Sequence, residues 1–360
     1  MVFRTFRNQA PDLARRCWAA IGVLRFEWRT RRQVDIPWRQ RLLCLRHGFN
    51  SRSASFYGSS LPPDPSLYIS DWREAALSKR PNRAYSLVLD DKLVFWLTMR
   101  RLTPHLAPLT GLVRQGRFYP IDRVEGHCPV DELVGRVTAP LVLKPARGTL
   151  GRGIHILEPG PDGLRINGKP GSAATILPSL RAGSYVVAPW IEQAAYARAI
   201  FPAAVNSIRV MTLIDPDSGE PFLPFAAHRF GVARTAPFDG FGTGGIVAGI
   251  DVSSGRVGPA VSAPPGRGRM VQEAHPDTGV PIAGVQVPRW GEICAHLLAL
   301  AGRVSFLPYI GWDVVVTDDG FLINEGNSRQ SLRVLQAACG PLLGDQRVRR
   351  FYRFHGVLGA

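Results

Sequence analysis

A chain of 360 residues with 45% hydrophobic and 20% charged residues is long enough for two packed units and too apolar for wholesale disorder. Its five cysteines are odd in number and form no C-x-x-C pair, which argues against a disulfide framework and a cysteine zinc site. No apolar run reaches the ~18 residues of a membrane-spanning helix, and the N-terminus lacks a secretory signal pattern. We therefore expect a globular, cytoplasmic protein.

The net charge of +16 is concentrated at the N-terminus. Residues 1–52 hold twelve arginines and three acidic residues, a local net charge of +9, and Trp18, Trp28 and Trp38 interleave with the arginines. Such a stretch can face anionic lipid at the inner membrane surface, nucleic acid or an acidic partner. Its plainest interpretation is a solvated helical layer whose aromatic side chains pack on the body of the protein. Because no sequence-reading DNA or RNA motif is present, we expect no specific nucleic-acid partner.

The middle and C-terminal parts of the chain show both helical and strand patterns. Asp71 and Glu74 form a capping-box pattern at the start of a short helix. Lys92 lies in the first turn of another predicted helix. Strands and helices do not alternate strictly, which favours an α+β fold over a doubly wound parallel sheet. Further elements are expected as strands at 139–148, 151–157, 184–191, 205–215 and 246–252, a helix at 290–301 and a hairpin at 311–327.

Lysine is rare in this chain, with four residues against forty arginines. Lys144 ends a predicted strand and is followed by a glycine-rich turn, "KPARGTLGRG". A lysine ammonium and exposed backbone N–H groups are a combination that can bind phosphate oxygens. The turn lacks the G-K-[ST] ending of a Walker loop. An ordinary glycine hairpin with an exposed lysine is the alternative interpretation.

The predicted hairpin "GWDVVVTDDGFLINEGN" brings oxygen ligands together. A three-residue loop at 318–320, closed by a left-handed glycine, would place Asp313 opposite Glu325. Directly opposed residues point to the same face of the hairpin, and Asn327 shares that face because it lies two residues further on. Two carboxylates and an amide oxygen suit a hard cation such as Mg²⁺. A two-residue loop would shift the register and separate the carboxylates, and a solvated acidic hairpin end is the alternative to a metal site.

Taken together, these motifs resemble the ATP-grasp enzymes and, within them, the sugar-transfer-associated ATP-grasp family. The resemblance covers about residues 45–350. It implies two α+β lobes that grip MgATP, with a glycine loop closing over the phosphates. In chain order, the resemblance rests on "DDKLVFW", "LVLKPARGTLGRGI", "VNSIRVMT", "FDGFGTGGIVAGIDVSSG", "HPDTGVPIAGVQVPRW" and "GWDVVVTDDGFLINEGN".

The resemblance also implies roles for individual residues. Lys92 and Lys144 would hold the α- and β-phosphates, and Arg209 would stabilise a γ-phosphate or an acyl phosphate, so Lys144 and Arg209 are the catalytic candidates. Asp313, Glu325 and Asn327 would bind Mg²⁺, with Mn²⁺ as an alternative. The remaining ATP-binding candidates are Gly148, Thr149, Gly151 and Gly153 in the phosphate lid and Ala188, Trp190, Ile191 and Glu192 around adenine and ribose.

The sequence departs from the family pattern on the acceptor side. Relatives often have an acidic residue or glutamine at the position of Ala188, and "DN" where Asp239 and Gly240 stand. They also tend to have proline and glycine after the final asparagine, where this chain continues Ser328-Arg329-Gln330. His228 and Arg229 lie near the expected acceptor pocket, and we interpret them as structural residues. These departures weaken inference about the substrate more than inference about ATP.

The implied function is an ATP- and Mg²⁺-dependent, ADP-forming ligase in polysaccharide biosynthesis. It would join a carboxylate to an amine through an acyl phosphate, on a sugar- or amino-acid-linked substrate. A kinase on the same scaffold and a basic lipid- or nucleic-acid-binding adaptor are the alternatives. The expected domains are a basic helical region at 1–65, a linking segment at 66–140, a small lobe with the lid at 141–195 and a large lobe with the metal site at 196–360.

Overall fold

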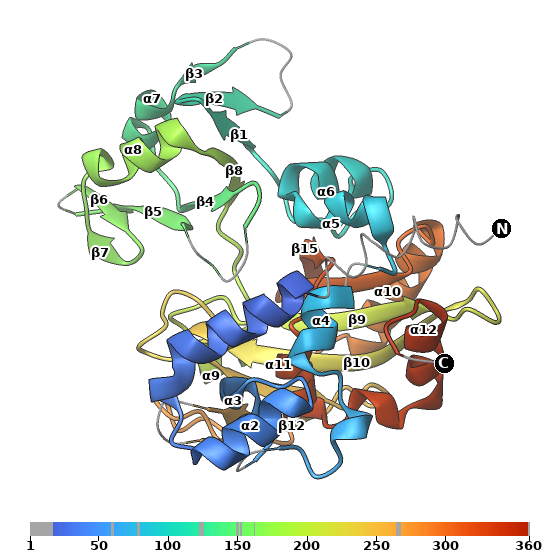
Figure 1. Ribbon diagram of the computed structural model, residues 1–360. Helices are drawn as coiled ribbons and strands as arrows, with labels where there is room; N and C mark the ends of the chain where they lie inside the picture. Colours follow the sequence, from blue (N-terminus) through green and yellow to red (C-terminus); the bar gives the residue numbers. More distant parts are fainter. Residues whose placement is uncertain are drawn as a thin grey trace.

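The computed structural model describes residues 17–58, 61–77, 80–121, 126–148, 151, 153–161, 163–263 and 268–358. Two antiparallel sheets, each covered by helices, form two lobes that lie at the upper left and in the lower half of Figure 1. This mixture of helices and antiparallel sheets confirms the expected α+β class. No helix in the described part of the chain is long and apolar enough to cross a membrane.

The smaller lobe is an eight-stranded sheet with two helices on one face. Its strand order is β3-β2-β1-β8-β4-β5-β6-β7. Apolar side chains of the sheet pack against α7 and α8, with Leu143, Val187 and Leu180 fully buried. The elements are β1 (Gly111–Arg114), β2 (Arg117–Pro120), β3 (Cys128–Pro129), α7 (Val130–Gly135), β4 (Leu141–Pro145), β5 (His155–Gly160), β6 (Gly163–Ile166), β7 (Lys169–Pro170), α8 (Ala173–Ala182) and β8 (Ser184–Pro189).

The smaller lobe begins earlier in the chain than the sequence suggested. Strands β1 to β3 fall within residues 66–140, the expected linking segment, but β1 pairs with β8 along its whole length. Short strands such as β1 carry too few residues for a strand pattern to be recognised from sequence alone. Hydrogen bonding to β8, which lies more than 70 residues further along the chain, makes them part of this sheet.

The larger lobe is a seven-stranded sheet with a hydrophobic core on each face. Its strand order is β13-β12-β11-β10-β9-β14-β15. Along β9, Val210 packs into the core beneath α10, whereas Met211 packs into the core beneath α11 and α12. The elements are β9 (Ile208–Ile214), β10 (Pro221–Phe230), β11 (Ile246–Ile250), β12 (Val257–Ser262), β13 (Met270–Gln272), α10 (Trp290–Arg303), β14 (Tyr309–Val316), β15 (Phe321–Asn327), α11 (Leu332–Cys339) and α12 (Gln346–Phe354).

Shorter helices connect the lobes and precede the smaller sheet. In Figure 1, α5 and α6 lie between the two lobes, and Leu89 and Phe95 from them extend the core beneath α10. These elements are η1 (Arg31–Gln33), α2 (Trp38–Arg46), α3 (Ser51–Ala54), η2 (Pro65–Leu67), α4 (Asp71–Leu77), η3 (Arg83–Tyr85), α5 (Ser86–Asp90), α6 (Lys92–Met99) and α9 (Ala195–Ile200). Two further short helices, η4 (Phe241–Thr243) and η5 (Leu342–Gly344), belong to the larger lobe.

Helix α4 forms where a capping box was expected, but its two carboxylates bind other segments. Asp71 accepts hydrogen bonds from the backbone N–H of Asn50 at 2.9 Å and the hydroxyl of Ser53 at 2.7 Å. Glu74 accepts one from the backbone N–H of Leu332 at 2.8 Å, at the start of α11. Both carboxylates therefore fasten distant parts of the chain together instead of capping their own helix.

The basic N-terminal region is helical, but its tryptophans do not pack on the body of the protein. A helix over residues 17–30 is followed by α2 and α3. Trp18, Trp28 and Trp38 are 67%, 68% and 69% exposed. The expectation of an inward-packing aromatic layer is therefore wrong, because smaller residues such as Ala19 and Val23 occupy the buried face of the helix instead.

Candidate functional site

The hairpin of β14 and β15 brings Asp313 opposite Glu325, as predicted, but by a different route. Thr317 and Gly320 exchange backbone hydrogen bonds of 2.9 and 3.3 Å, so the loop has only two residues. This register alone would pair Asp313 with Asn324. A β-bulge at Asn324 inserts one extra residue and restores the pairing with Glu325. Gly320 also lacks the predicted left-handed conformation, since its φ is not positive.

Asp313 is the centre of a buried charge cluster. Its side chain accepts hydrogen bonds from Arg209 Nε at 2.5 Å and Nη2 at 3.2 Å, and from Arg229 Nη2 at 2.9 Å. The carboxylate is 2% exposed. Burial alone would raise the pKa of Asp313, but the two guanidinium groups outweigh burial and hold that pKa well below its usual range. Asp313 is therefore ionised and doubly paired.

Arg229 extends the cluster toward the loop after β10. Its Nε lies 3.5 Å from Asp239 Oδ2 and donates to Ser207 Oγ at 3.1 Å. The backbone N–H of Ser207 donates to the same Asp239 oxygen at 3.0 Å. Burial lowers the pKa of Arg229, whereas Asp239, Asp313 and Glu325 raise it by more, so that the guanidinium stays charged. Arg229, expected from the sequence to be structural, is therefore a member of the charge cluster, which no sequence pattern indicates.

The neighbouring His228 faces away from the cluster. It is fully buried, and its ring stacks on that of Phe230 with the ring centroids 4.2 Å apart. It also forms a hydrogen bond of 2.9 Å with the hydroxyl of Tyr196. Burial lowers the pKa of His228 to about 3, so it is neutral. Alternation along β10 separates the two side chains, and only Arg229 reaches the charge cluster.

Both predicted phosphate-binding lysines reach the hairpin from outside the larger sheet. Lys144, on β4, donates to Asn324 Oδ1 at 2.8 Å. Lys92, the first residue of α6, lies 3.5 Å from Glu325 Oε2 and donates to the carbonyl of Gly148 at 3.3 Å. Burial lowers the pKa of Lys144 despite the nearby Glu325. We call the meeting point of these lysines, the hairpin oxygens and the charge cluster the interlobe site.

The glycine-rich turn after β4 lies against both lobes. Arg147 Nε donates to Asp91 Oδ2 at 2.8 Å, and Asp91 caps α6. Gly151 and Gly153 have φ values of 68° and 72°, a left-handed backbone that favours glycine. A Cβ placed on Gly151 would lie 3.8 Å from the ring of Phe238 in the larger lobe. Thr149, also predicted to bind phosphate, lies outside the described residues.

The predicted adenine-binding segment forms the connection between the two sheets. Ala188 pairs with Val142 within the smaller sheet, and the backbone N–H of Trp190 donates to Pro140 at 3.1 Å. Four residues later, Ala194 N–H donates to Val316 of β14 at 2.8 Å. Ile191 is half-buried and Glu192 is exposed on this connection. The segment has the position of a hinge, and its adenine-binding role stays a prediction.

The predicted magnesium ligands share one end of the hairpin. Asn327 lies opposite Gly311 and donates through Nδ2 to its carbonyl at 3.4 Å. The Glu325 side chain keeps 24% of its surface exposed. No group of three His, Cys, Asp or Glu side chains in the described ranges is arranged to hold a metal. The predicted set is two carboxylates and an amide, which offer the hard oxygen donors that Mg²⁺ prefers, although both Asp313 oxygens already accept hydrogen bonds from Arg209 or Arg229.

Gln330 is a polar residue of the interlobe site that the sequence analysis passed over. It is 1% exposed, and neither side-chain polar atom has a hydrogen-bond partner among the described residues. The amide occupies the space over Gly311, where an added Cβ would lie 2.0 Å from Oε1. Its backbone carbonyl accepts from Arg209 Nη1 at 3.1 Å. The only signal in the sequence was the departure from the family pattern at Ser328-Arg329-Gln330.

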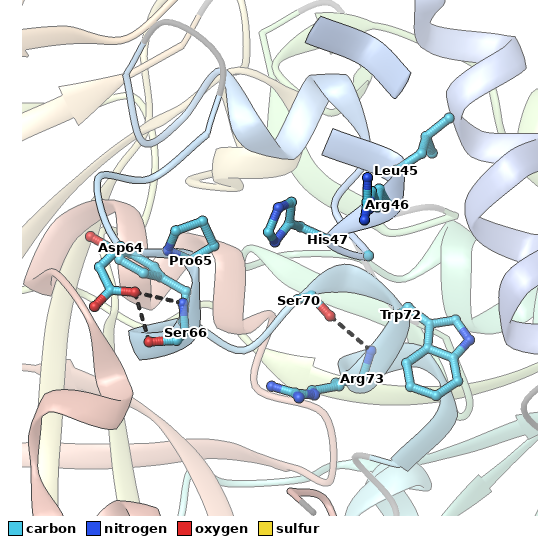
Figure 2. Close-up of a pocket in the computed structure, with 11 residues that line it drawn as sticks. Leu45, Arg46, His47, Asp64, Pro65, Ser66, Ser70, Trp72 and Arg73 are labelled. Carbon is cyan, nitrogen blue, oxygen red and sulfur yellow. Dashed lines mark hydrogen bonds between the residues drawn. The ribbon is translucent and has the colours of Figure 1, made fainter. Parts of the chain in front are cut away.

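A separate cavity of ≈ 660 Å³ lies beside the N-terminal helices (Figure 2). Asp64 and Ser66 lie on one side of it and Trp72 on the other, with His47, Ser70 and Arg73 between them. The lining residues are Leu45, Arg46, His47, Gly48, Asp64, Pro65, Ser66, Tyr68, Ser70, Trp72 and Arg73. None of the residues predicted to bind ATP or metal belongs to this lining.

Comparison with known proteins identifies one family. A family model described as sugar-transfer associated ATP-grasp matches residues 73–350. No curated protein matches the sequence of this chain.

Among solved structures, biotin carboxylase from Campylobacter jejuni is 12% identical, with a TM-score of 0.43 over 76% of this chain and 47% of that one. D-alanine–D-alanine ligase from Bacillus anthracis is 12% identical, with a TM-score of 0.37, and the match covers 80% of this chain and 72% of that one. An ADP complex of N5-carboxyaminoimidazole ribonucleotide synthetase is 14% identical, with a TM-score of 0.36 over 70% and 52%, so the chain spans about half of its length.

Proposed function

Because the chain belongs to the sugar-transfer associated ATP-grasp family, we propose that it is an ATP-dependent ligase that joins a carboxylate to an amine. The observation that supports this function is that a lysine of the smaller lobe and a lysine of helix α6 meet oxygen donors of the larger lobe. Lys144 lies 2.8 Å from Asn324, and Lys92 lies 3.5 Å from Glu325. Positive groups and hard oxygen donors in one place are what a triphosphate with its magnesium ion requires.

In this proposal, the cations of the interlobe site neutralise the phosphates of ATP. Lys92 and Lys144 hold the α- and β-phosphates, and the turn at 148–153 covers them with backbone N–H groups. Asp313, Glu325 and Asn327 would hold Mg²⁺, which supplies charge neutralisation when bound. In this structure Lys144 donates a hydrogen bond to Asn324 Oδ1, and Lys92 lies 3.5 Å from Glu325 Oε2. Both lysines therefore exchange a protein partner for phosphate when the nucleotide binds.

The two arginines have different places in the proposed reaction. The Arg209 side chain is 9% exposed and donates to Asp313 twice, whereas the Arg229 side chain is 18% exposed. Arg229 is therefore better placed to contact the transferred phosphoryl group, and Arg209 contributes charge and holds Asp313. Positive charge fixed in advance near a phosphoryl group stabilises its transfer without reorganisation.

The chemistry has two steps. A carboxylate oxygen of the substrate attacks the γ-phosphorus of ATP, the bond to the β,γ-bridging oxygen breaks, and ADP leaves. The resulting acyl phosphate is an activated electrophile. An amine attacks its carbonyl carbon, phosphate leaves and a proton is released, which forms the amide. We propose a sugar-linked substrate on the basis of the family description, with an amino-acid-linked substrate as the alternative.

A kinase on the same scaffold is the second candidate, since the same cations would serve transfer to a hydroxyl group. The test is a screen for ADP release over amino acids and amino- or uronic-acid sugars, with hydroxylamine added. Trapping as a hydroxamate supports the ligase, because only an acyl phosphate yields it. ADP release with a stable phosphate ester supports the kinase instead.

The same screen tests the site assignment through Glu325→Gln. We expect this variant to lose ADP release and to keep its melting temperature within a few degrees, because Glu325 is partly exposed. The control is Glu132→Gln, whose carboxylate pairs with Arg136 on the surface, and it should keep full activity. Full activity in Glu325→Gln would contradict the proposed site.

A further inference from the structure

We propose that the helix over residues 17–30 and helix α2 form a surface that docks the protein on an anionic lipid bilayer. The membrane-docking surface is made of exposed apolar side chains flanked by arginines. It is independent of the interlobe site, and its failure would leave the proposed ligase function untouched. Its apolar members are Trp18, Ile21, Leu24, Trp28, Trp38 and Leu42.

The helix over residues 17–30 exposes large apolar side chains beside Arg25 and Arg29, whereas the solvent face of an ordinary surface helix is polar. Trp18, Ile21 and Trp28 lie on one side of it and are 67%, 41% and 68% exposed. The opposite side carries Ala19 and Val23 against the protein. Nearly half of the large apolar side chains that are exposed in the described part of the chain lie within residues 18–43. Isolated exposed apolar residues are normal, but a cluster marks an interaction site.

Helix α2 continues this surface. Trp38, Leu42 and Arg46 follow at intervals of four residues and therefore share one side of the helix. The cavity shown in Figure 2 opens at the end of α2, and Arg46 and Arg73 belong to its lining. The two helices are joined through Arg41, which donates to Glu27 at 2.9 Å and to the carbonyl of Arg31 at 2.7 Å. They also lie together at the front of Figure 1.

The charge of the surface complements an anionic membrane. Residues 17–52 contain eight arginines against Glu27 and Asp35, a net charge of +6, and Glu27 is already neutralised by Arg41. Arg31 lies over the ring of Trp28 at 3.5 Å and Arg39 over that of Trp38 at 5.5 Å. The exposed arginines here are Arg25, Arg29, Arg32, Arg39 and Arg46.

The composition favours lipid over nucleic acid as the partner. Tryptophan and arginine suit either partner, but Ile21, Leu24 and Leu42 have no π-face to stack on a base. Aliphatic side chains gain most by entering the boundary between headgroups and acyl chains, while arginines pair with lipid phosphates. Tryptophan prefers that same boundary. One surface thus combines the three residue types of an interfacial membrane anchor.

Vesicle flotation of the full chain tests this proposal. Vesicles of phosphatidylcholine mixed with phosphatidylglycerol should bind the protein, and vesicles of phosphatidylcholine alone should bind it weakly. Binding should fall as salt is raised, because lipid–arginine attraction is screened. Replacing Trp18, Trp28 and Trp38 by serine should weaken binding by more than about tenfold. Each of Arg25→Gln, Arg29→Gln and Arg39→Gln should weaken it by about fivefold at low salt.

The matched control is Phe354→Ser, an aromatic side chain that is also 69% exposed but lies on α12. This variant should bind vesicles like the parent protein. Unchanged melting temperatures in all variants would show that folding is intact. The proposal is overturned if the parent protein does not float with anionic vesicles. It is equally overturned if the triple serine variant still binds them, or if the surface instead forms a dimer between two chains that excludes lipid.

Discussion

The two sides of the interlobe site compensate their charges in different ways. On the larger sheet, Asp313 is buried and held by both Arg209 and Arg229. On the other side, Lys144 of the smaller lobe donates to Asn324, and Lys92 of helix α6, between the lobes, lies 3.5 Å from Glu325, which stays partly exposed. A fully paired cluster is rigid and expensive to break, whereas single contacts can be exchanged. We infer that the larger sheet provides a fixed charge pattern and that the lysines provide the exchangeable part.

The largest effect is expected where the fixed cluster is broken. Asp313→Asn removes the shared counter-charge and leaves two arginines buried without it. We expect the free energy of unfolding to fall by about 3–5 kcal/mol, because an uncompensated buried charge is strongly unfavourable. Urea unfolding monitored by circular dichroism measures the free energy of unfolding of the variant and of the parent protein.

The control is Asp131→Asn, which removes one partner of an exposed ion pair with Arg181. It should change the free energy of unfolding by no more than about 0.5 kcal/mol. If Asp313→Asn were as mild as the control, the cluster would not be the rigid part of the site.

The exchangeable side is tested by Lys144→Met. ATP affinity should fall by about ten- to a hundredfold, because a charge-assisted contact to phosphate is lost. The nucleotide-free variant should be more stable than the parent protein, since burial lowers the pKa of Lys144. Nucleotide-dependent thermal shifts measure both effects, and Lys169→Met, an exposed lysine on β7, serves as the control.

The stability difference between nucleotide-free Lys144→Met and the parent protein should become smaller as the pH rises. A lysine whose pKa is lowered in the folded protein binds fewer protons there than in the unfolded chain. Stability of the parent protein therefore rises with pH between the lowered pKa and the ordinary value of 10.5. The advantage of Lys144→Met should shrink over that interval. An advantage that grows instead would mean that the pKa of Lys144 is raised in the folded state.

The smallest expected effect is at Gln330, where stability should rise, in contrast to Asp313→Asn. Gln330→Met removes a buried amide that has no hydrogen-bond partner among the described residues, so the free energy of unfolding should rise by about 1–3 kcal/mol. The backbone bond to Arg209 is unaffected. If the amide contacts substrate, ADP release should fall although the protein is more stable. Gln336→Met is the control. This buried amide forms hydrogen bonds with the Ile69 backbone and the Tyr57 hydroxyl, so its loss should lower the free energy of unfolding.

Much of the fold and part of the site could be predicted because they depend on local patterns. The α+β class and the strand at Lys144 follow from alternation and turn residues, and the ATP-grasp fold is implied by the family resemblance. The pairing of Asp313 with Glu325 was expected from a three-residue loop, whereas the hairpin reaches it through a two-residue loop and a β-bulge. The β-bulge at Asn324 could not be predicted, because nothing in its neighbours distinguishes a two-residue loop with a bulge from a three-residue loop. The bulge also places Asn324 within reach of Lys144. Residue spacing in the sequence could not predict this contact.

The sequence alone therefore determined the chemical inventory: rare lysines, a glycine turn, acidic hairpin residues and a basic, tryptophan-rich N-terminus. Only the tertiary structure decided how these groups are paired, as with Arg229 against Asp313 and the Gln330 amide, which finds no partner in the described part of the chain. It also decided that the N-terminal tryptophans face outward. The physical reason is that periodicity reports which face a residue occupies, whereas pairing and exposure depend on other elements of the chain, 84 residues away in the case of Arg229 and Asp313.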